Sequence, residues 1–360
     1  MPTNGDFIQR HAEAVSLHHK VSVMHLISDK NISNSYIDIK TINNVSTCIG
    51  YVKHSSNPIL KMIRFYKIYK QLLKRIGAFE LIHLNVLFPF GVFALHQKFF
   101  KKKPYIITEH WTGYQLTKDH NIPFLQRCIS RKITKNAAVI SPVSFQLQKS
   151  MQKIGLKGTY VPIGNTIDTD IFKQENSKDK LFTIIHISSL HNQQKNISGM
   201  LRVAKKLENH IDNFTWKFVG GSIKNYKNEI AKLDLKSNTV QFIEHVSQNE
   251  LSKHIQKAHV CVSFSNYETF GITVTEAIAC GTFVISTNTG ILAETPKEDF
   301  FSIIPIGDED ALLYEIIRQK NKKSTFNIQG MNQYISQKFS PKVIANQFSE
   351  LYLKTLNNNS

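Results

Sequence analysis

Residues 260–281 read VCVSFSNYETFGITVTEAIACG, and this stretch decides the fold. The apolar run at 260–264 predicts a buried strand, a short loop containing a glycine follows, and a helix is expected to begin near Thr273. Gly281 suits the left-handed conformation in which many helices end. A buried strand that passes through a short loop into a helix is the repeating unit of parallel α/β folds.

The loop and the start of the helix have the chemistry of a ligand site. In parallel α/β sheets ligands bind at the carboxyl ends of strands, and the free N–H groups at 271–274 would attract an anion. Gly271 permits close approach to the backbone, while Glu268 and Glu276 can face one crevice and accept hydrogen bonds from sugar hydroxyls. A nucleotide sugar supplies both anion and hydroxyls. The simpler interpretation, an acidic helix start beside a surface glutamate, is favoured by the spacing taken alone.

The rest of the chain repeats this pattern in two series. A polar segment at 173–180 (KQENSKDK) lies between the two series and marks the expected domain junction. A last helix is expected at 341–356, with Ser340 as N-cap and Pro341 as its first residue. The expected strands are 21–27, 81–85, 105–108, 138–142 and 159–162 in the first series, and 182–187, 215–219, 239–242, 260–264 and 282–286 in the second.

Length and composition indicate a two-domain globular enzyme. The chain has 360 residues, and 41% of them are hydrophobic. The four cysteines lack metal-ligand spacing, which predicts buried thiols in a reducing compartment. Neither a secretory signal nor an apolar run of about 20 residues is visible. We therefore expect a cytoplasmic protein.

Several motifs resemble glycosyltransferase family 4. Glu268-Thr-Phe-Gly271 followed by Glu276 and Gly281 is similar to the E-x₇-E signature of that family. The other similar segments follow in the family's order along nearly the whole chain. They are 7–15, 83–85 and 108–111, which resemble bacterial enzymes of surface-polysaccharide synthesis, then 161–168 with Phe172, 187–190 with Lys195, Thr289-Gly290 through Glu294, and Gly307-Asp308.

The resemblance implies an α/β protein of GT-B type, with two Rossmann-like domains facing across a cleft and a C-terminal helix that returns to the N-terminal domain. The implied acceptor-side domain is 1–172, the nucleotide-sugar domain is 173–340, and the terminal helix and tail are 341–360. Family members begin with a strand that leads into a glycine-bearing loop, whereas here only the loop PTNG is present. We therefore expect the first strand of the N-terminal domain to be missing.

The resemblance also assigns the donor site. Glu276 would hold the ribose hydroxyls and Glu268 those of the transferred sugar. Phe270, Gly271 and Ile272 would contact sugar and phosphate through their backbone.

Further site residues follow from the same resemblance. Lys195 would neutralise the diphosphate, whose charge suits a cation, although an ordinary solvated lysine is the alternative. Ser189 occupies a position where the family commonly has arginine, which removes one diphosphate contact. Gly5 could approach the donor phosphates, and His110 would lie over the donor sugar, with Glu109 as its competitor.

Positive charge is concentrated in the first half of the chain. Residues 1–173 carry 24 Lys and Arg against 9 Asp and Glu, out of a total net charge of +18. Five basic residues line one side of an expected helix at 57–77, with Ile63, Tyr66, Tyr69, Leu73 and Ile76 toward another side, and Lys98 and 101–103 form a second cluster with Phe99 and Phe100. An anionic membrane surface near a lipid-linked acceptor is one interpretation, and a core helix with a solvated face is the other.

The predicted function is a retaining glycosyltransferase that moves a sugar from a nucleoside-diphosphate sugar to a hydroxyl of a glycan or lipid-linked acceptor in surface-polysaccharide synthesis. Retention is implied by the family. The family resemblance also implies that no metal takes part, and no nucleic-acid partner is expected. A GT-B phosphorylase or epimerase and a non-catalytic nucleic-acid-binding protein are the alternatives. The protein is expected in the cytoplasm, at the inner face of the membrane.

Overall fold

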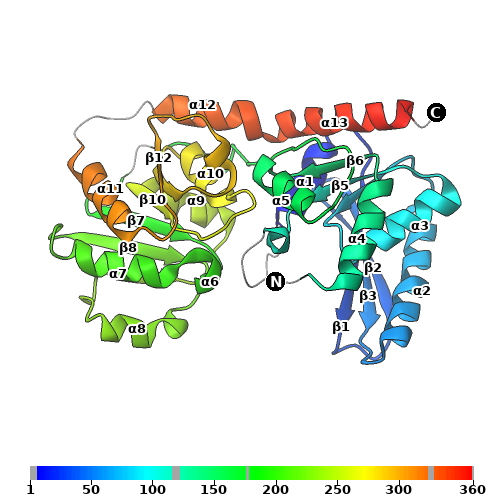
Figure 1. The fold of residues 1–360 in the computed structure, drawn as a ribbon, viewed down its shortest axis with the longest axis horizontal. Helices are drawn as coiled ribbons and strands as arrows, with labels where there is room; N and C mark the ends of the chain where they lie inside the picture. Colours follow the sequence, from blue (N-terminus) through cyan, green and yellow to red (C-terminus); the bar gives the residue numbers. More distant parts are fainter. Residues whose placement is uncertain (1–5, 116–121, 176–177, 323–327, 359–360) are drawn as a thin grey trace.

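The structure is a computed structural model that describes residues 6–115, 122–175, 178–322 and 328–358. Its strands fall into two groups that form two lobes, one from the first half of the chain and one from the second (Figure 1). The last strand of the first group, β6 (Val139–Pro142), and the first of the second, β7 (Phe182–Ile187), lie on either side of the expected junction. The exact domain boundaries stay a prediction.

The N-terminal lobe contains two three-stranded sheets with strand orders β1-β3-β2 and β4-β5-β6. Strands β4, β5 and β6 are parallel, and their apolar side chains pack with helices α3, α4 and α5 in one core cluster. The elements of this lobe are α1 (Asp6–Val15), β1 (Ser22–Asp29), β2 (Tyr36–Ile42), β3 (Val45–Lys53), α2 (Pro58–Ile76), β4 (Ile82–Asn85), α3 (Gly91–Lys101), β5 (Tyr105–Glu109), η1 (Thr112–Tyr114), α4 (Phe124–Asn136), β6 and α5 (Phe145–Lys153).

The hairpin of β2 and β3 was not predicted from the sequence. The two strands pair antiparallel, and Asn43 and Asn44 form the two-residue turn with φ of 46° and 65°. Asparagine tolerates the left-handed conformation that such tight hairpin turns require. The predicted strand at 159–162 was wrong, because this segment makes only an isolated bridge between Ile140 and Tyr160.

The C-terminal lobe is built on a six-stranded parallel sheet with the order β12-β11-β10-β7-β8-β9. This is the doubly wound order, in which the direction of winding reverses between β7 and β10. Its elements after β7 are α6 (Asn192–Lys195), α7 (Ile197–Leu207), β8 (Phe214–Val219), η2 (Ile223–Asn225), α8 (Lys227–Lys232), β9 (Val240–Ile243), α9 (Gln248–Lys257), β10 (Val260–Ser263), α10 (Ile272–Ala279), β11 (Phe283–Thr287), η3 (Gly290–Glu294), β12 (Phe301–Ile304) and α11 (Glu309–Asn321). Strand β12 was not predicted.

The last two helices connect the lobes. Helix α12 (Ile328–Phe339) and helix α13 (Pro341–Asn357) follow each other along one side of the molecule (Figure 1). Met331 and Ile335 of α12 are buried in the core cluster that contains α10, whereas Ile344 and Phe348 of α13 are buried with residues of β5 and β6. The return of the C-terminal helix to the N-terminal domain is therefore confirmed.

We predict that Phe348→Ala will lower the free energy of unfolding by about 3–5 kcal/mol, the usual cost of removing a fully buried phenylalanine ring. Phe348 lies 4.9 Å from the ring of His83 and is inaccessible to solvent. Leu353→Ala on the same helix is the control, because Leu353 is 55% exposed and its loss should change stability by less than about 0.5 kcal/mol. Urea denaturation followed by circular dichroism measures both. Equal effects would contradict the assigned packing of α13.

Candidate functional site

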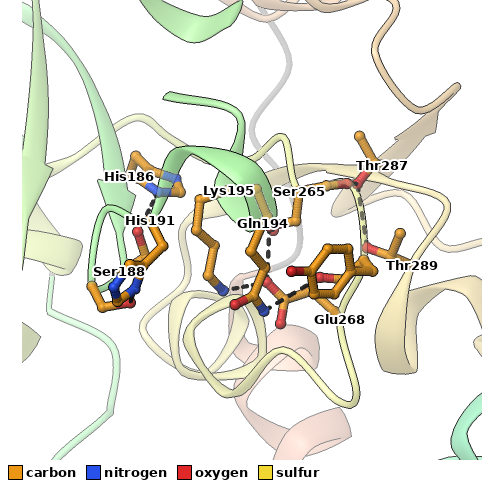
Figure 2. A network of polar contacts seen from close by, with 12 residues as sticks. His186, Ser188, His191, Gln194, Lys195, Ser265, Glu268, Thr287 and Thr289 are labelled. Carbon is orange, nitrogen blue, oxygen red and sulfur yellow. Dashed lines mark hydrogen bonds and ion pairs between the residues drawn. The ribbon is translucent and has the colours of Figure 1, made fainter. Parts of the chain in front are cut away.

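The site lies where the winding of the C-terminal sheet reverses. Strands β7 and β10 pair directly. Lys195 is the last residue of α6, the short helix that follows β7, and Glu268 lies in the loop that follows β10. Lys195 Nζ contacts Glu268 Oε1, and the Oγ of Ser265 donates to the same oxygen at 2.8 Å (Figure 2). Both members of the ion pair are largely buried, with 16% and 11% of their side chains exposed. The structure therefore brings these two predicted residues into direct contact.

The loop that carries Glu268 is fixed by hydrogen bonds from neighbouring segments. Thr287 Oγ1 donates to the carbonyl oxygen of Ser265 at 2.6 Å, and Asn266 N donates to the carbonyl oxygen of Gln194 at 2.8 Å. Beneath the loop after β7, the ring of His186 bonds Ser188 Oγ through Nε2 at 2.8 Å (Figure 2). These bonds hold the carboxylate and the cation in place before any ligand arrives, which is the preorganisation that a charged ligand requires.

Helix α10 begins at Ile272, one residue before the predicted start. Gly271 is the N-cap residue and has φ 89° and ψ 62°, a conformation that favours glycine. The side chain of Phe270 is buried and packs edge-on against Phe339, so this residue can meet a ligand only through its backbone. Gly281 has φ 72°, and the predicted left-handed helix end is confirmed.

Glu276 lies one turn into α10 and contacts a residue that was not predicted. Arg10 Nη1, from α1 of the N-terminal lobe, donates to Glu276 Oε1 at 2.8 Å. Only 11% of the arginine side chain and 3% of the glutamate side chain are exposed. Arg10 is the one cation on α1, but nothing in the sequence indicates that α1 faces α10, because that depends on how the two lobes meet.

Polar side chains of the N-terminal lobe hold the Glu268 loop from the other side. Gln115 Nε2 donates to the carbonyl oxygen of Glu268, and Ser144 Oγ donates to that of Thr269 at 2.6 Å. Gly290 N donates to Gln146 Oε1 at 2.9 Å. These contacts were also missed, since each joins residues more than a hundred positions apart.

The carboxylate of Glu294 makes a further contact between the lobes. It accepts hydrogen bonds from the backbone N–H groups of Phe145 and Gln146 at the start of α5. A carboxylate at the N-terminus of a helix is stabilised by the free N–H groups and the helix dipole. Glu294 therefore caps a helix of the opposite lobe.

His110 lies in the N-terminal lobe against α1. Its ring contacts that of Phe7 at a tilt of 38°, with centroids 4.3 Å apart, and its centroid lies 5.4 Å from that of the His11 ring. Among the described residues, no direct contact joins His110 to Glu268 or Glu276. Burial, followed by the neighbouring His11 and His83, lowers the pKa of His110 well below its usual value, which keeps the imidazole neutral.

Glu109, the predicted competitor of His110, has a structural role. Its buried carboxylate accepts hydrogen bonds from the backbone N–H groups of Leu87, His110 and Trp111, each at 2.9 Å. Burial raises the pKa of Glu109 to about 7, although these three bonds act in the opposite direction. The side chain thus joins β5 to the segment after β4.

Two predicted phosphate contacts have different outcomes. Ser189 is exposed, and its hydroxyl is 2.9 Å from Nδ1 of the neighbouring His191. Gly5 lies outside the described residues.

Among the residues that the structure describes, no group of three or more His, Cys, Asp or Glu could hold a metal ion. The same part of the chain contains no helix that is long and apolar enough to span a membrane.

Comparison with known proteins gives the family. The model of Glycosyltransferase Family 4 matches residues 10–171, and the model of Glycosyl transferases group 1 matches residues 167–331. The chain is a family 4-like glycosyltransferase. No curated protein sequence matches it.

Solved structures similar to this glycosyltransferase show the same fold. Sucrose-phosphate synthase from Thermosynechococcus elongatus has a TM-score of 0.80 at 19% identity, covering 98% of this chain and 93% of that one. HepE from Anabaena, in complex with UDP-glucose, has a TM-score of 0.73 at 14% identity, covering 92% and 99%. A glycosyltransferase from Rickettsia africae has 0.71 at 16%, covering 95% and 100%. The predicted GT-B fold with two Rossmann-like domains is confirmed.

Buried histidines are predicted to make the stability of the enzyme depend on pH. Burial lowers the pKa of His11 to about 4 and that of His83 to about 3, from ordinary values of 6.5. Because the folded state holds them neutral, their contribution to stability is complete above pH 6.5 and is lost as the pH falls toward 4 and 3. Glu109 opposes this loss, because its raised pKa makes the folded state bind a proton more readily than the unfolded state between pH 7 and 4.5. This gain involves one proton, whereas the loss involves both histidines.

We therefore expect His11→Phe to flatten the fall in stability between pH 6.5 and 4 by about 3 kcal/mol, at about 1.4 kcal/mol for each pH unit. Urea denaturation at several pH values measures this difference. His210→Phe is the control, since His210 is exposed, and it should leave the pH dependence unchanged. If stability falls with pH as steeply in His11→Phe as in the wild type, buried His11 is not a cause of the pH dependence.

Proposed function

We propose that this enzyme is a retaining glycosyltransferase that moves a sugar from a nucleoside-diphosphate sugar to a hydroxyl of a glycan or lipid-linked acceptor in surface-polysaccharide synthesis. One observation carries the donor class: two buried carboxylates, each paired with a cation, lie beside the start of α10, where the sheet reverses its winding. A ligand that carries both hydroxyls and phosphates matches this site, because carboxylates accept hydrogen bonds from hydroxyls and the cations attract phosphates.

The proposed division of roles follows the chemistry of each group. Glu276 accepts hydrogen bonds from the ribose hydroxyls, and Glu268 accepts those of the transferred sugar. The backbone of Phe270, Gly271 and Ile272, at the positive end of the α10 dipole, contacts sugar and phosphate. Lys195 lies close enough to exchange its bond with Glu268 for one with the departing diphosphate, whose negative charge grows as the sugar–oxygen bond breaks.

His110 has a proposed role that its neutral state permits. A neutral imidazole can donate one hydrogen bond and accept another, so it can orient a sugar hydroxyl or one of the reacting oxygens. Its lowered pKa argues against a role as a permanent cation beside the diphosphate. The similarity to HepE, which has been solved with UDP and glucose and with UDP-glucose, supports a nucleotide-sugar donor.

The surface of α2 supports an acceptor at a membrane. The buried residues of α2 are Ile68, Tyr69 and Leu72, whereas Ile63 and Tyr66 are exposed. Exposed apolar side chains therefore share the first half of α2 with lysines. These apolar residues are Ile59, Leu60, Met62, Ile63 and Tyr66.

The apolar surface continues from α2 onto α3. Tyr66 lies 6.0 Å from the ring of His96, which lies 4.8 Å from Phe100. Phe99 and Phe100 are more than half exposed beside Lys101 and Lys102. Exposed aromatic and aliphatic groups among lysines suit the boundary of an anionic bilayer, where apolar groups insert and lysines meet lipid phosphates. We infer that this face holds the enzyme near a lipid-linked acceptor at the inner face of the membrane.

The alternative functions predict different products. A phosphorylase would release a sugar phosphate when supplied with inorganic phosphate, and an epimerase would convert the nucleotide sugar without an acceptor. A nucleic-acid-binding protein would use lysines, but the exposed Ile59, Met62 and Phe100 beside them suit lipid better than a phosphate backbone. The expectation that no metal takes part stays a prediction.

We predict that a nucleotide sugar from at least one of four classes, UDP-, GDP-, ADP- or dTDP-sugars, will raise the midpoint temperature of thermal unfolding. A ligand that binds only the folded state stabilises it by mass action. Glu276→Ala should abolish this shift, since the ribose loses its carboxylate. Glu350→Ala, an exposed glutamate on α13, is the matched control and should keep the full shift. No shift with any of the four donor classes would refute the proposed donor site.

We also predict that the protein will float with vesicles containing about 30% phosphatidylglycerol but not with phosphatidylcholine vesicles. Replacing Lys61, Lys67, Lys70 and Lys74 of α2 with glutamine should lower the bound fraction more than tenfold, because each lysine near an anionic surface adds to binding. The matched control replaces four exposed lysines of the C-terminal lobe, Lys224, Lys227, Lys232 and Lys253. An equal loss in both variants would show that α2 is not the contact surface.

A further inference from the structure

We propose that Arg10 is a second cation for the donor's diphosphate, and that it leaves Glu276 for a phosphate oxygen when the donor binds. This assignment rests on the proposed function, because it names a residue of that same donor site. Arg10 belongs to the N-terminal lobe, whereas the other contacts proposed for the diphosphate in the described residues, Lys195 and the backbone at 270–272, belong to the C-terminal lobe.

The position of Arg10 places its charge within the donor site. Its guanidinium crosses from α1 to α10 and reaches Glu276, one turn into that helix, at 2.8 Å. Its Cζ lies 5.6 Å from the ring centre of Phe172, so the ring and the carboxylate both orient the fork. A phosphate at the start of α10 would be within reach after a rotation of this side chain.

The guanidinium has unused hydrogen-bonding capacity. Arg10 Nε is buried, and the described residues offer it no hydrogen-bond partner. A buried donor without a partner is costly, and a guanidinium has five N–H groups arranged in a fork that fits phosphate oxygens. An incoming diphosphate would satisfy the group that Glu276 leaves unsatisfied.

The charges of the site explain why the exchange would be favourable. Without donor, Glu268 is paired with Lys195 and Glu276 with Arg10. A diphosphate carries more negative charge than either carboxylate, and it attracts both cations. Once the cations move to phosphate, the two carboxylates become available to the hydroxyls of the sugar and the ribose.

The position of Ser189 strengthens the need for Arg10. The loop after β7 has an exposed serine at position 189, which carries no charge and is bonded to His191. Lys195 would then face a diphosphate alone from this side of the cleft. Arg10 supplies the missing charge from the opposite lobe.

The test separates phosphate binding from nucleoside binding. Isothermal titration calorimetry with UDP, GDP, ADP and dTDP identifies the base that the wild type prefers, and competition with the matching nucleoside measures binding without phosphate. Arg10→Gln should lower the affinity for the diphosphate by about 10- to 100-fold, the range of a charge-assisted hydrogen bond, and that for the nucleoside by less than about threefold. Arg10→Lys should be intermediate, since it keeps the charge and loses the fork. Arg75→Gln, an exposed arginine on α2, should change neither.

Inorganic pyrophosphate provides a second measurement that does not involve ribose. Glu276→Gln should keep or increase pyrophosphate affinity, because it releases Arg10, whereas Arg10→Gln should lower it. Equal losses of diphosphate and nucleoside affinity in Arg10→Gln would overturn the proposal, since Arg10 would then act only by positioning Glu276. Unchanged affinities would overturn it as well. If the wild type binds none of the four diphosphates, that result would instead refute the donor site itself.

Discussion

Glu268 and Glu276 are charged groups that lie almost completely out of solvent, and their burial is the constraint on which the rest of the site depends. A buried carboxylate is tolerated only with a cation or several hydrogen-bond donors beside it. Lys195 meets this need for Glu268 from within the C-terminal lobe, and Arg10 meets it for Glu276 from the other lobe. The second pair can form only when the lobes are in contact. The charge balance of the donor site and the arrangement of the lobes are therefore linked.

Local sequence patterns predicted the elements on which the site is built. The run of apolar residues before Glu268, the glycine at 271 and the glycine at 281 each have a local physical meaning, and the strand, the loop and the helix were found at these positions. The family resemblance placed Lys195 and Glu268 in one donor site, where ligands bind at the carboxyl ends of the strands, but their direct pairing was not predicted. These inferences needed only short stretches of chain.

The contacts between the lobes could not be predicted in the same way. Arg10 and Glu276 are 266 positions apart, and no periodicity relates them. The hairpin turn at Asn43 and Asn44 was missed for another reason, because glycine is the more familiar signal for such turns. On α2, the helical period was recognised, but the spacing of apolar residues alone does not show which of them pack against β3 and which stay exposed.

Because the C-terminal helix packs on the first lobe, that lobe is not formed by one continuous stretch of the chain. Phe348 and Tyr352 belong to the core of the first lobe although they are among the last residues of the chain, and Tyr352 is hydrogen-bonded through its hydroxyl to His83 at 2.6 Å. Cutting the backbone between β6 and β7 would not yield two complete units. The first fragment would expose the apolar residues that α13 covers, and the second would carry an amphipathic helix without its partner. Each half of the chain would be able to complete its fold only in the presence of the other.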